Sequence, residues 1–187
     1  MRSWPKMAAG YLVPVNVKPC SDPSRGSGVF ATAPVKKGTL LWQPDQVKAV
    51  PAEQITADLA AMPHDDAHVR LMLQRYSILF LSFRLLSTWR GLLQVLLRQS
   101  FVAPSNAEAL CINPSDNGRF TNHSATPNVG ACVDHSNDSY ALQDIAEGDE
   151  LTCDYSGFVT PDWYKQLCKK YEVLTTQEVV ELSAKQV

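Results

Sequence analysis

Two short segments of this 187-residue chain share one pattern, and this repeat limits the folds that the chain can adopt. The first segment is RGSGVFATAPVKKGTLLW, with a turn at residues 36–38, and the second is SYALQDIAEGDELTCDY, with a turn at residues 146–148. Each has short alternating strands on both sides of a glycine that can adopt a positive φ. The equivalent positions are Ala31 and Ala141, Val35 and Ile145, Gly38 and Gly148, and Leu41 and Leu151. The pattern predicts a β-hairpin in each segment, and two copies are too few for a solenoid, so both are expected to belong to one small-strand β fold.

The region between the two segments has a helical pattern. Residues 52–62, AEQITADLAAM, predict a short helix that ends before Pro63, and residues 65–101 form a longer apolar run. The polar positions of this run follow helical spacing at Arg84, Ser87, Thr88, Gly91, Gln94 and Arg98. Arginine interrupts the run too often for a transmembrane helix, which needs about 20 mostly apolar residues. Three interpretations remain open: a helical insertion packed on the sheets, a basic amphipathic helix that contacts a partner or a membrane surface through residues 77–101, or poorly folded extra sequence.

The charges are distributed unevenly along the chain, although the net charge is only −2. Residues 67–107 contain five arginines and no acid, whereas residues 120–164 contain eight acids and neither lysine nor arginine. The acids either follow the turns, where Asp is common, or form an acidic rim that attracts a cationic substrate such as a lysine-rich peptide. One basic stretch in a slightly acidic chain is a poor match to nucleic-acid-binding proteins, so no nucleic-acid partner is expected.

The cysteines and the first residues of the chain favour an intracellular protein. The five cysteines are odd in number, lie far apart and form no Cys-x-x-Cys pair, which argues against a disulfide framework and against a cysteine-rich zinc site. The first 15 residues lack an apolar stretch long enough for a signal peptide, and their two prolines would break a transit helix. We therefore expect a reducing compartment, which is the cytoplasm or nucleus with an organelle not excluded, and no metal.

A polar loop, FTNHSATPN at residues 120–128, places an amide and an imidazole beside a proline. A lone histidine in such a turn is more often structural than functional. Here, however, three segments occur in order: GSGVF at residues 26–30, RFTNHSATPN at residues 119–128 and GDELTCDY at residues 148–155. Together they closely resemble the three signature segments of the SET-domain lysine methyltransferases. The resemblance covers about half of the chain, roughly residues 11–45 and 108–158.

This resemblance implies a mainly β (α+β) fold. It is a β-clip-like arrangement of small sheets with a knot-like C-terminal crossing, a helical insertion and a C-terminal helix. The crossing would join the Asn-His loop to the segment that carries Tyr155. We expect one domain over residues 1–187. Its parts are N-terminal strands at 11–45, the insertion at 46–107, cofactor and catalytic segments at 108–158, and a helical cap at 159–187.

The resemblance also implies S-adenosylmethionine as cofactor and methyl transfer to the side-chain amine of lysine in a protein or peptide. Tyr155 would be the catalytic tyrosine. Gly26 and Gly28 would let the backbone approach the methionine end of the cofactor, because glycine has no Cβ. Asn122 and His123 would hold the methionine amine and the adenine edge. The further cofactor contacts implied are Ser27, Val29, Phe30, Arg119, Phe120 and Tyr155.

The C-terminal residues depart from the pattern of many family members, in which a Cys-x-Cys zinc cluster follows the tyrosine. In place of zinc, Phe158, Trp163 and Tyr164 would supply apolar walls for the lysine channel, and a helix starting near Pro161 would cap the site. Cys168 is expected to be a core thiol. Cys153, in a position that is often aromatic in the family, would leave room for more than one methyl.

The apolar and basic insertion leaves a second interpretation open. The chain could be a non-catalytic SET-like module that recruits a partner through its insertion. The sequence identifies neither the target protein nor the degree of methylation.

Overall fold

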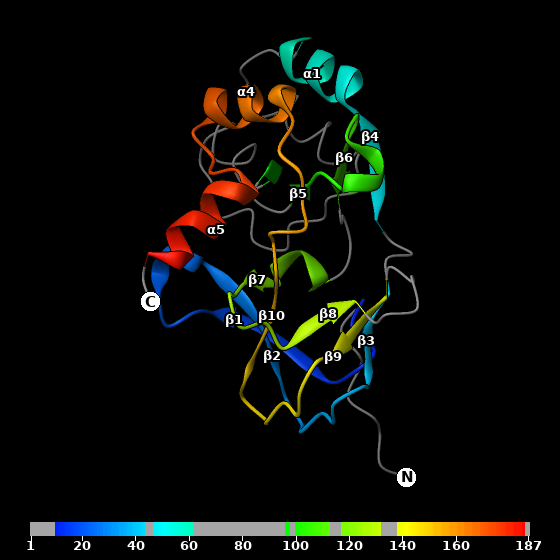
Figure 1. The fold of residues 1–187 in the computed structure, drawn as a ribbon, viewed down its shortest axis with the longest axis vertical. Helices are drawn as coiled ribbons and strands as arrows, with labels where there is room; N and C mark the ends of the chain where they lie inside the picture. The colour runs from blue at the N-terminus through cyan, green and yellow to red at the C-terminus, as the bar shows by residue number, and fades with distance from the viewer. Residues whose placement is uncertain are drawn as a thin grey trace. The chain divides into compact units, whose positions relative to one another are not determined.

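The computed structural model describes six stretches of the chain: residues 10–43, 47–61, 96–97, 100–112, 117–131 and 138–185. The chain divides into two compact units, each with its own hydrophobic core. Unit 1 comprises residues 1–46, 116–155 and 183–187, and unit 2 comprises residues 47–115 and 156–182. Figure 1 labels the helices and strands. The expected single domain over residues 1–187 stays a prediction.

Unit 1 contains two small sheets. The first has the strand order β1-β2-β10-β7, in which β1 (Val15–Pro19), β2 (Ser27–Ala31) and β10 (Glu150–Cys153) run antiparallel. Its last strand, β7 (Asn122–His123), is parallel to β10. A 3-10 helix, η1 (Pro23–Arg25), lies between β1 and β2 in the sequence.

The second sheet of unit 1 is antiparallel and has the order β3-β9-β8. Its strands are β3 (Leu40–Trp42), β8 (Val129–Ala131) and β9 (Ser139–Ala141). The 3-10 helix η4 (Asn117–Phe120) leads into the Asn-His segment. All of these elements are short, as the alternating pattern of the sequence predicts.

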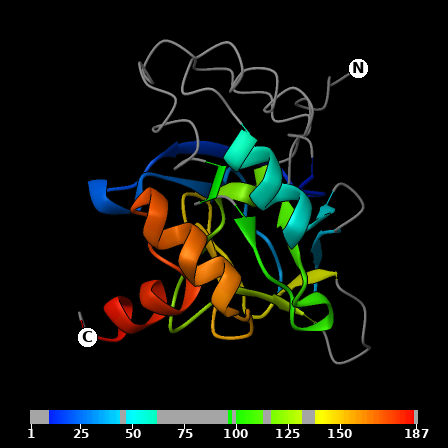
Figure 2. The same cartoon turned by 90° about the horizontal axis from the view of Figure 1, so that it is seen from above.

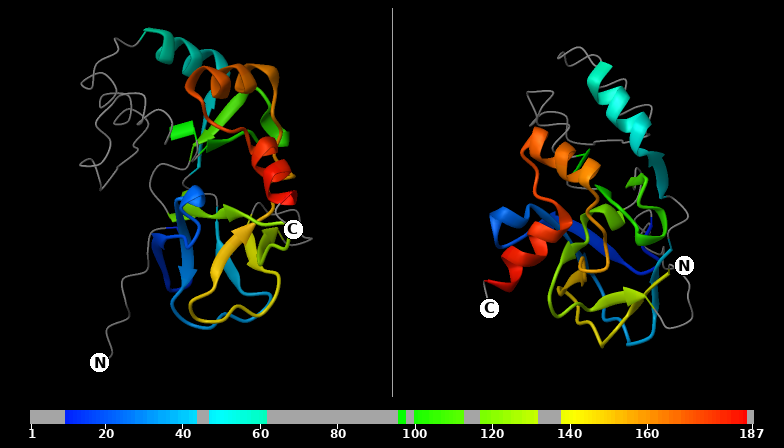
Figure 3. Two further views of the ribbon diagram at one scale, coloured as in Figure 1. Left: turned by 90° about the vertical axis from the view of Figure 1, so that its left-hand side faces the viewer. Right: turned by 45° about the horizontal axis from the view of Figure 1, so that its top comes forward.

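The two repeated segments pair with each other rather than within themselves, so the prediction of two β-hairpins is wrong. Strand β2 pairs with β10, β3 pairs with β9, and Val35 forms an isolated bridge with Ile145. The two segments lie side by side in Figure 1 and Figure 3. An alternating strand offers the same backbone N–H and C=O groups to a strand of its own segment and to a strand of the other segment. The pattern alone therefore cannot distinguish a hairpin from pairing between the two segments.

The hydrogen bonds between the two segments are reciprocal. The amide of Gly38 donates to the carbonyl of Ala141 at 2.8 Å, and the amide of Gly148 donates to the carbonyl of Ala31 at 2.8 Å. Both glycines have positive φ, 82° and 91°, as the turns were expected to require. The three apolar pairs of the repeat all lie in the core of unit 1, together with Tyr11, Val13, Val29 and Val129.

Unit 2 contains an antiparallel sheet of order β4-β6-β5. Its strands are β4 (Lys48–Pro51), β5 (Ser100–Phe101) and β6 (Ala109–Ile112). The 3-10 helix η3 (Pro104–Asn106) connects β5 to β6. The strand at Ser100–Phe101 corrects the expectation of a helix up to residue 101, because these two residues pair with β6 instead.

Helices of unit 2 pack over its core. Helix α1 (Ala52–Ala61) and helix α4 (Asp162–Tyr171) contact each other, and Figure 2 shows them side by side. Helix α5 (Thr176–Ala184) follows α4. The predicted helices at residues 52–62 and after Pro161 are thus confirmed, and Cys168 is buried at 1 % exposure, as predicted.

Most of the predicted apolar and basic run lies outside the described residues. Two of its leucines, Leu96 and Leu97, are described and are buried in the core of unit 2. Among the residues that the structure describes, no helix is long and apolar enough to cross a membrane. The interpretation of residues 77–101 as a contact surface remains untested.

Candidate functional site

The Asn-His segment and the segment that ends at Tyr155 are adjacent in unit 1. Strand β7 pairs with β10 so that Asn122 faces Thr152 and His123 faces Cys153. Beyond β7, the amide of Ser124 donates to the carbonyl of Cys153 at 3.0 Å. Two motifs that are far apart in the sequence therefore form one short parallel pair. The knot-like form of the expected crossing stays a prediction.

Asn128, at the end of the Asn-His loop, forms side-chain hydrogen bonds to the backbone of β10. Its Nδ2 donates to the carbonyl of Glu150 at 2.8 Å, and its Oδ1 accepts from the amide of Thr152 at 2.9 Å. The side chain is 8 % exposed. The side-chain amide of Asn128 thus pairs with two backbone groups of β10, as the backbone of a neighbouring strand would do. No role was expected for Asn128, although its place in the Pro-Asn pair of the motif is a usable signal.

Tyr155 makes two hydrogen bonds to the Asn-His segment. Its hydroxyl donates to the carbonyl of Thr121 at 2.7 Å, and its backbone amide donates to Nδ1 of His123 at 3.1 Å. The two rings lie 5.4 Å apart between centroids. Nδ1 of His123 is therefore directed at the backbone of Tyr155. The phenol and the imidazole are thereby held in one fixed arrangement.

Burial raises the pKa of the Tyr155 phenol above its ordinary value of 10.0, and nearby Cys153 and Tyr11 raise it further. Burial also raises the pKa of the Cys153 thiol to about 12, with a smaller contribution from Asp154. Both groups are therefore protonated at neutral pH. A protonated phenol is suited to orienting a polar group rather than to accepting a proton.

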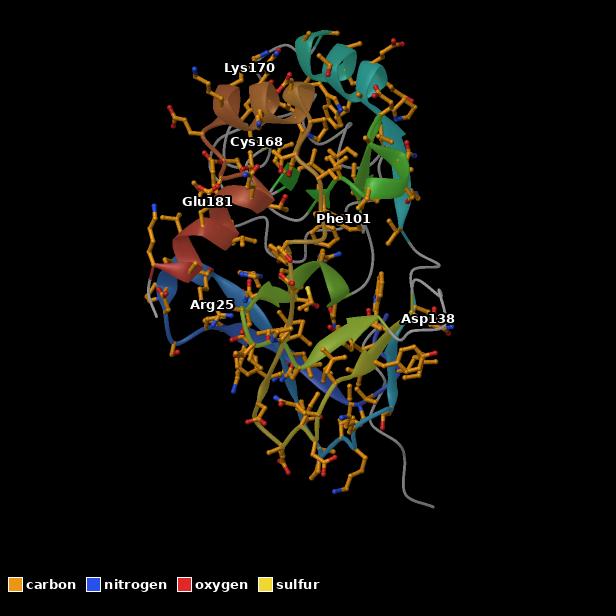
Figure 4. The ribbon with its side chains drawn as sticks, in the orientation of Figure 1. Arg25, Phe101, Asp138, Cys168, Lys170 and Glu181 are labelled. Atoms are coloured by element: carbon orange, nitrogen blue, oxygen red, sulfur yellow. The ribbon has the colours of Figure 1, made fainter. Side chains whose placement is uncertain are left out.

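Glu150 links three parts of the candidate site. Asn122 donates from Nδ2 to Oε1 of Glu150 at 2.8 Å and to the carbonyl of Ser27 at 3.1 Å. Arg25, labelled in Figure 4, forms an ion pair with the same carboxylate, with both nitrogen–oxygen distances at 3.0 Å. The Sγ atom of Cys20 lies 3.5 Å from Oε1 of Glu150. The roles of Glu150 and Cys20 could not be predicted from the sequence, because their partners lie more than 20 residues away in the chain.

The two glycines of the first motif are required for different structural reasons. A Cβ atom on Gly28 would lie 2.5 Å from Oε1 of Glu150 and 3.0 Å from Sγ of Cys20, so a larger residue would displace this carboxylate. Gly26 has a φ of 69° at the end of η1, and no atom lies within 4 Å of its Cβ position. Gly28 is thus required by close packing and Gly26 by backbone conformation. An approach of the cofactor to either residue stays a prediction.

The remaining predicted cofactor residues are also in unit 1. Val29 is fully buried in the core and lies between β1 and β10, so its contact with a cofactor stays a prediction. The ammonium of Lys18 lies 4.2 Å from the ring centroid of Phe30. The guanidinium of Arg119 lies 4.9 Å from the ring centroid of Phe120.

The predicted channel residues belong to different units. Cys153 is partly buried in unit 1. In unit 2, Phe158 stacks on Phe101 with ring centroids 4.5 Å apart, and Trp163 donates from Nε1 to the carbonyl of Ala107 at 2.9 Å. A lysine channel formed by these side chains therefore stays a prediction. Among the described residues, no three His, Cys, Asp or Glu side chains gather in a metal-binding cluster.

The sequence and the fold were compared with known proteins. Residues 26–156 match the sequence model of the SET domain. Because this match covers well over half of the chain, the protein belongs to the SET domain family. The comparison with curated proteins gave no match.

Solved structures with a similar fold include Polycomb Repressive Complex 2 of Chaetomium thermophilum. In its autoinhibited conformation bound to S-adenosylmethionine, the matching chain is 15 % identical, with a TM-score of 0.50 over 88 % of this protein. A humanized mutant of that complex bound to an inhibitor is 16 % identical, with a TM-score of 0.46 over 82 %. This protein covers only 17 % and 16 % of the respective matching chains. The similarity to the first structure supports the mainly β, α+β fold predicted from the sequence.

Proposed function

We propose that this protein transfers a methyl group from S-adenosylmethionine to the side-chain amine of lysine in a protein substrate. Membership of the SET domain family supports this activity, and a protein of similar fold is bound to S-adenosylmethionine. The observation that carries the proposal is the arrangement in unit 1. The Tyr155 phenol, the His123 imidazole and the Asn122 amide come from two distant motifs and are held together by hydrogen bonds.

The residues present fit the amino-acid end of this cofactor. The Nδ2 atom of Asn122 is engaged by Glu150 and Ser27, while in the described part of the chain no group donates to its Oδ1. That oxygen could therefore accept a hydrogen bond from the cofactor's ammonium. The backbone of residues 26–28 lies beside Asn122 through the Ser27 carbonyl, and Gly26 is exposed with open surroundings, whereas Gly28 is packed against Glu150. The bound cofactor would supply a methyl group on a positively charged sulfur.

Tyr155 would orient the substrate amine rather than remove its proton. The phenol remains protonated, and its proton is directed to the carbonyl of Thr121. Its oxygen would accept an N–H of a neutral lysine, which would turn the nitrogen lone pair toward the methyl group. Lysine has an ordinary pKa of about 10.4, and an apolar site near a positive charge would lower that pKa and favour the neutral amine. The transfer forms one N–C bond, breaks one S–C bond and releases one proton from nitrogen.

The acids of the C-terminal repeated segment could either stabilise turns or attract the proposed cationic substrate. Asp144 accepts from the ammonium of Lys36 and from the amide of Lys37, and Asp149 accepts from the amide of Ala146. These two carboxylates therefore stabilise turns, as the first interpretation of the acidic segment predicts. The proposed substrate class is a lysine-bearing protein in an intracellular compartment, and its recognition is not assigned to these acids.

Cofactor binding and methyl transfer test the proposal together. We expect the wild-type protein to bind S-adenosylmethionine by isothermal titration calorimetry and to incorporate radiolabelled methyl groups into lysine-containing proteins of a lysate. Tyr155→Phe should retain binding and lose about a hundredfold or more of the turnover, since it removes one preorganised hydrogen-bonding group. Asn122→Ala should instead weaken cofactor binding.

Tyr164→Phe is a matched control, because it removes a buried hydroxyl from the core of unit 2. It should leave both binding and turnover unchanged. A wild-type protein that binds no cofactor would contradict the proposal and favour a non-catalytic module. Turnover that survives Tyr155→Phe would contradict the role given to the phenol.

A further inference from the structure

We propose that Tyr11 is a positioning residue that holds the Tyr155 phenol in place through Thr121, an inference that rests on the function proposed above. Tyr11 lies outside residues 26–156, which match the SET domain. It belongs to none of the three motifs of the sequence. Its connection to the candidate site comes entirely from the tertiary structure.

Thr121 joins the two phenols with different groups. Its side-chain Oγ1 shares a hydrogen bond of 2.7 Å with the Tyr11 hydroxyl, in which either oxygen can be the donor. Its carbonyl accepts the Tyr155 hydroxyl at 2.7 Å. Its amide donates to the carbonyl of Gly118 at 3.0 Å. Side chain, carbonyl and amide of one residue are thus all fixed, which defines the direction in which the carbonyl points.

Tyr11 is itself firmly held. It is 2 % exposed and belongs to the core of unit 1, where it forms an isolated bridge with Trp42 of β3. The amide of the next residue, Leu12, donates to the carbonyl of Leu41 at 2.8 Å. A buried side chain next to paired backbone has little rotational freedom. The Tyr11 hydroxyl therefore has a fixed position and restrains the Thr121 side chain through their hydrogen bond.

This connection matters because a phenol that orients an amine must point in one direction. The carbonyl of Thr121 receives the Tyr155 proton and so sets the rotation of the hydroxyl. If the bond to Tyr11 is lost, the Thr121 backbone loses one of the contacts that hold it, and the carbonyl that accepts from the Tyr155 hydroxyl is placed less precisely. Small displacements of a positioning group reduce rates strongly while leaving distant binding contacts intact. Tyr11 also contributes to the raised pKa of Tyr155, in agreement with their proximity.

The simpler explanation is that the hydrogen bond only satisfies two polar groups in a crowded region. The two explanations differ in what Tyr11→Phe does. A purely structural role predicts a lower melting temperature with kcat unchanged. A positioning role predicts a lower kcat, by about fivefold to tenfold, with KM for S-adenosylmethionine unchanged, as expected for one lost hydrogen bond.

A double-mutant cycle adds a readout that stability alone cannot produce. Thr121→Val keeps the carbonyl and removes Oγ1, so it should lower kcat as much as Tyr11→Phe does. The double variant should lose no more than either single variant, because both changes break the same bond. Thr121→Ser should restore most of the rate by retaining the hydroxyl. Additive losses in the double variant, or an unchanged kcat in Tyr11→Phe, would overturn the inference.

A spectroscopic measurement separates this inference from the proposed function. With ring-carbon-labelled tyrosine, the NMR signal of Tyr155, assigned by its loss in Tyr155→Phe, should shift in Tyr11→Phe and in Thr121→Val. It should not shift in the control Tyr164→Phe, which removes a buried hydroxyl from unit 2. If the wild-type protein is inactive but the Tyr155 signal still shifts in the two variants, the proposed methyl transfer is refuted and the connection between the two phenols is retained. An unchanged Tyr155 signal would refute the connection, whether or not the protein is active.

Discussion

The two repeated segments of unit 1 share a framework but differ in their chemistry. Both place a positive-φ glycine in the turn and a fully buried leucine in the following strand. In the described part of the chain, the strand of the N-terminal segment, β3, pairs with β9 and has an isolated bridge to Tyr11, whereas the equivalent strand β10 has strand β2 on one side and strand β7 on the other. The additional neighbour of β10 is the Asn-His segment. The repeat therefore supplies the framework, and the added parallel strand supplies the polar groups.

Individual positions show how the two strands diverge. By the alignment, Glu150 of β10 corresponds to Leu40 of β3, and Cys153 corresponds to Gln43. Leu40 cannot bind an arginine or orient an amide, whereas Glu150 does both, with Arg25 and Asn122. A duplicated framework can thus keep its core pattern while the equivalent strands β3 and β10 differ in their polar groups.

The largest expected effects come from the equivalent leucines, Leu41 and Leu151, which are both 0 % exposed. Each change to alanine should lower the free energy of unfolding by about 2–5 kcal/mol, because it removes buried methyl groups and leaves a cavity. Chemical denaturation measures this loss. Only Leu151→Ala should also weaken cofactor binding, since Leu151 lies between Glu150 and Thr152. Equal losses of affinity in both variants would show that the framework copies do not differ as we infer.

A second difference is that the thiol of Cys153 titrates and its counterpart Gln43 does not. The pKa of Cys153 is raised from 9.0 to about 12 in the folded protein, so the unfolded chain loses this proton first. The stability that the protonated thiol contributes is therefore complete below pH 9 and is lost as the pH rises toward 12. The slope is at most about 1.4 kcal/mol per pH unit and is smaller for a partly exposed group.

Cys153→Ser tests this contribution, because serine does not titrate in this range. Denaturation curves measured from pH 8 to pH 11 should show a weaker pH dependence in the variant than in the wild type. The raised pKa of Tyr155 acts in the same direction above pH 10 and remains in both proteins. Parallel pH profiles would contradict the assignment of this contribution to Cys153.

The smallest expected effects come from the turn glycines, and they test the symmetry of the repeat. Gly38 and Gly148 have φ values of 82° and 91°, and no atom lies within 4 Å of either Cβ position. Changing either to alanine should therefore cost about 1 kcal/mol of backbone strain and nothing for steric contact. Gly157 has similarly open surroundings and no positive φ, so Gly157→Ala serves as the control. Chemical denaturation measures the free energy of unfolding of each variant. Unequal decreases in this free energy for Gly38→Ala and Gly148→Ala would show that the two turns are not equivalent.

Much of the fold can be predicted from local patterns. The turn glycines, the apolar repeat positions, helix α1 and the start of helix α4 after Pro161 each depend on a few neighbouring residues, and the structure has them as expected. The hairpins are wrong because strand pairing is a choice between distant partners that share one local pattern. The strand at Ser100–Phe101 was missed for the same reason, since it exists only through β6.

The candidate site could be predicted in part. Asn122, His123 and Tyr155 follow from motifs, and the structure brings them together in unit 1. Glu150 stands within a motif but acquires its partners only from tertiary structure. Tyr11 carries no local signal, because its partner lies 110 residues further along the chain.

By itself, the sequence determined which residues have the chemistry for this site and where the backbone can turn, because side-chain type and glycine conformation are local properties. Only the tertiary structure decided which strands pair, which carboxylate meets Asn122, and which phenol faces Thr121. The physical reason is that hydrogen bonds and burial act over a few ångströms in space, so their partners are fixed when distant segments pack together.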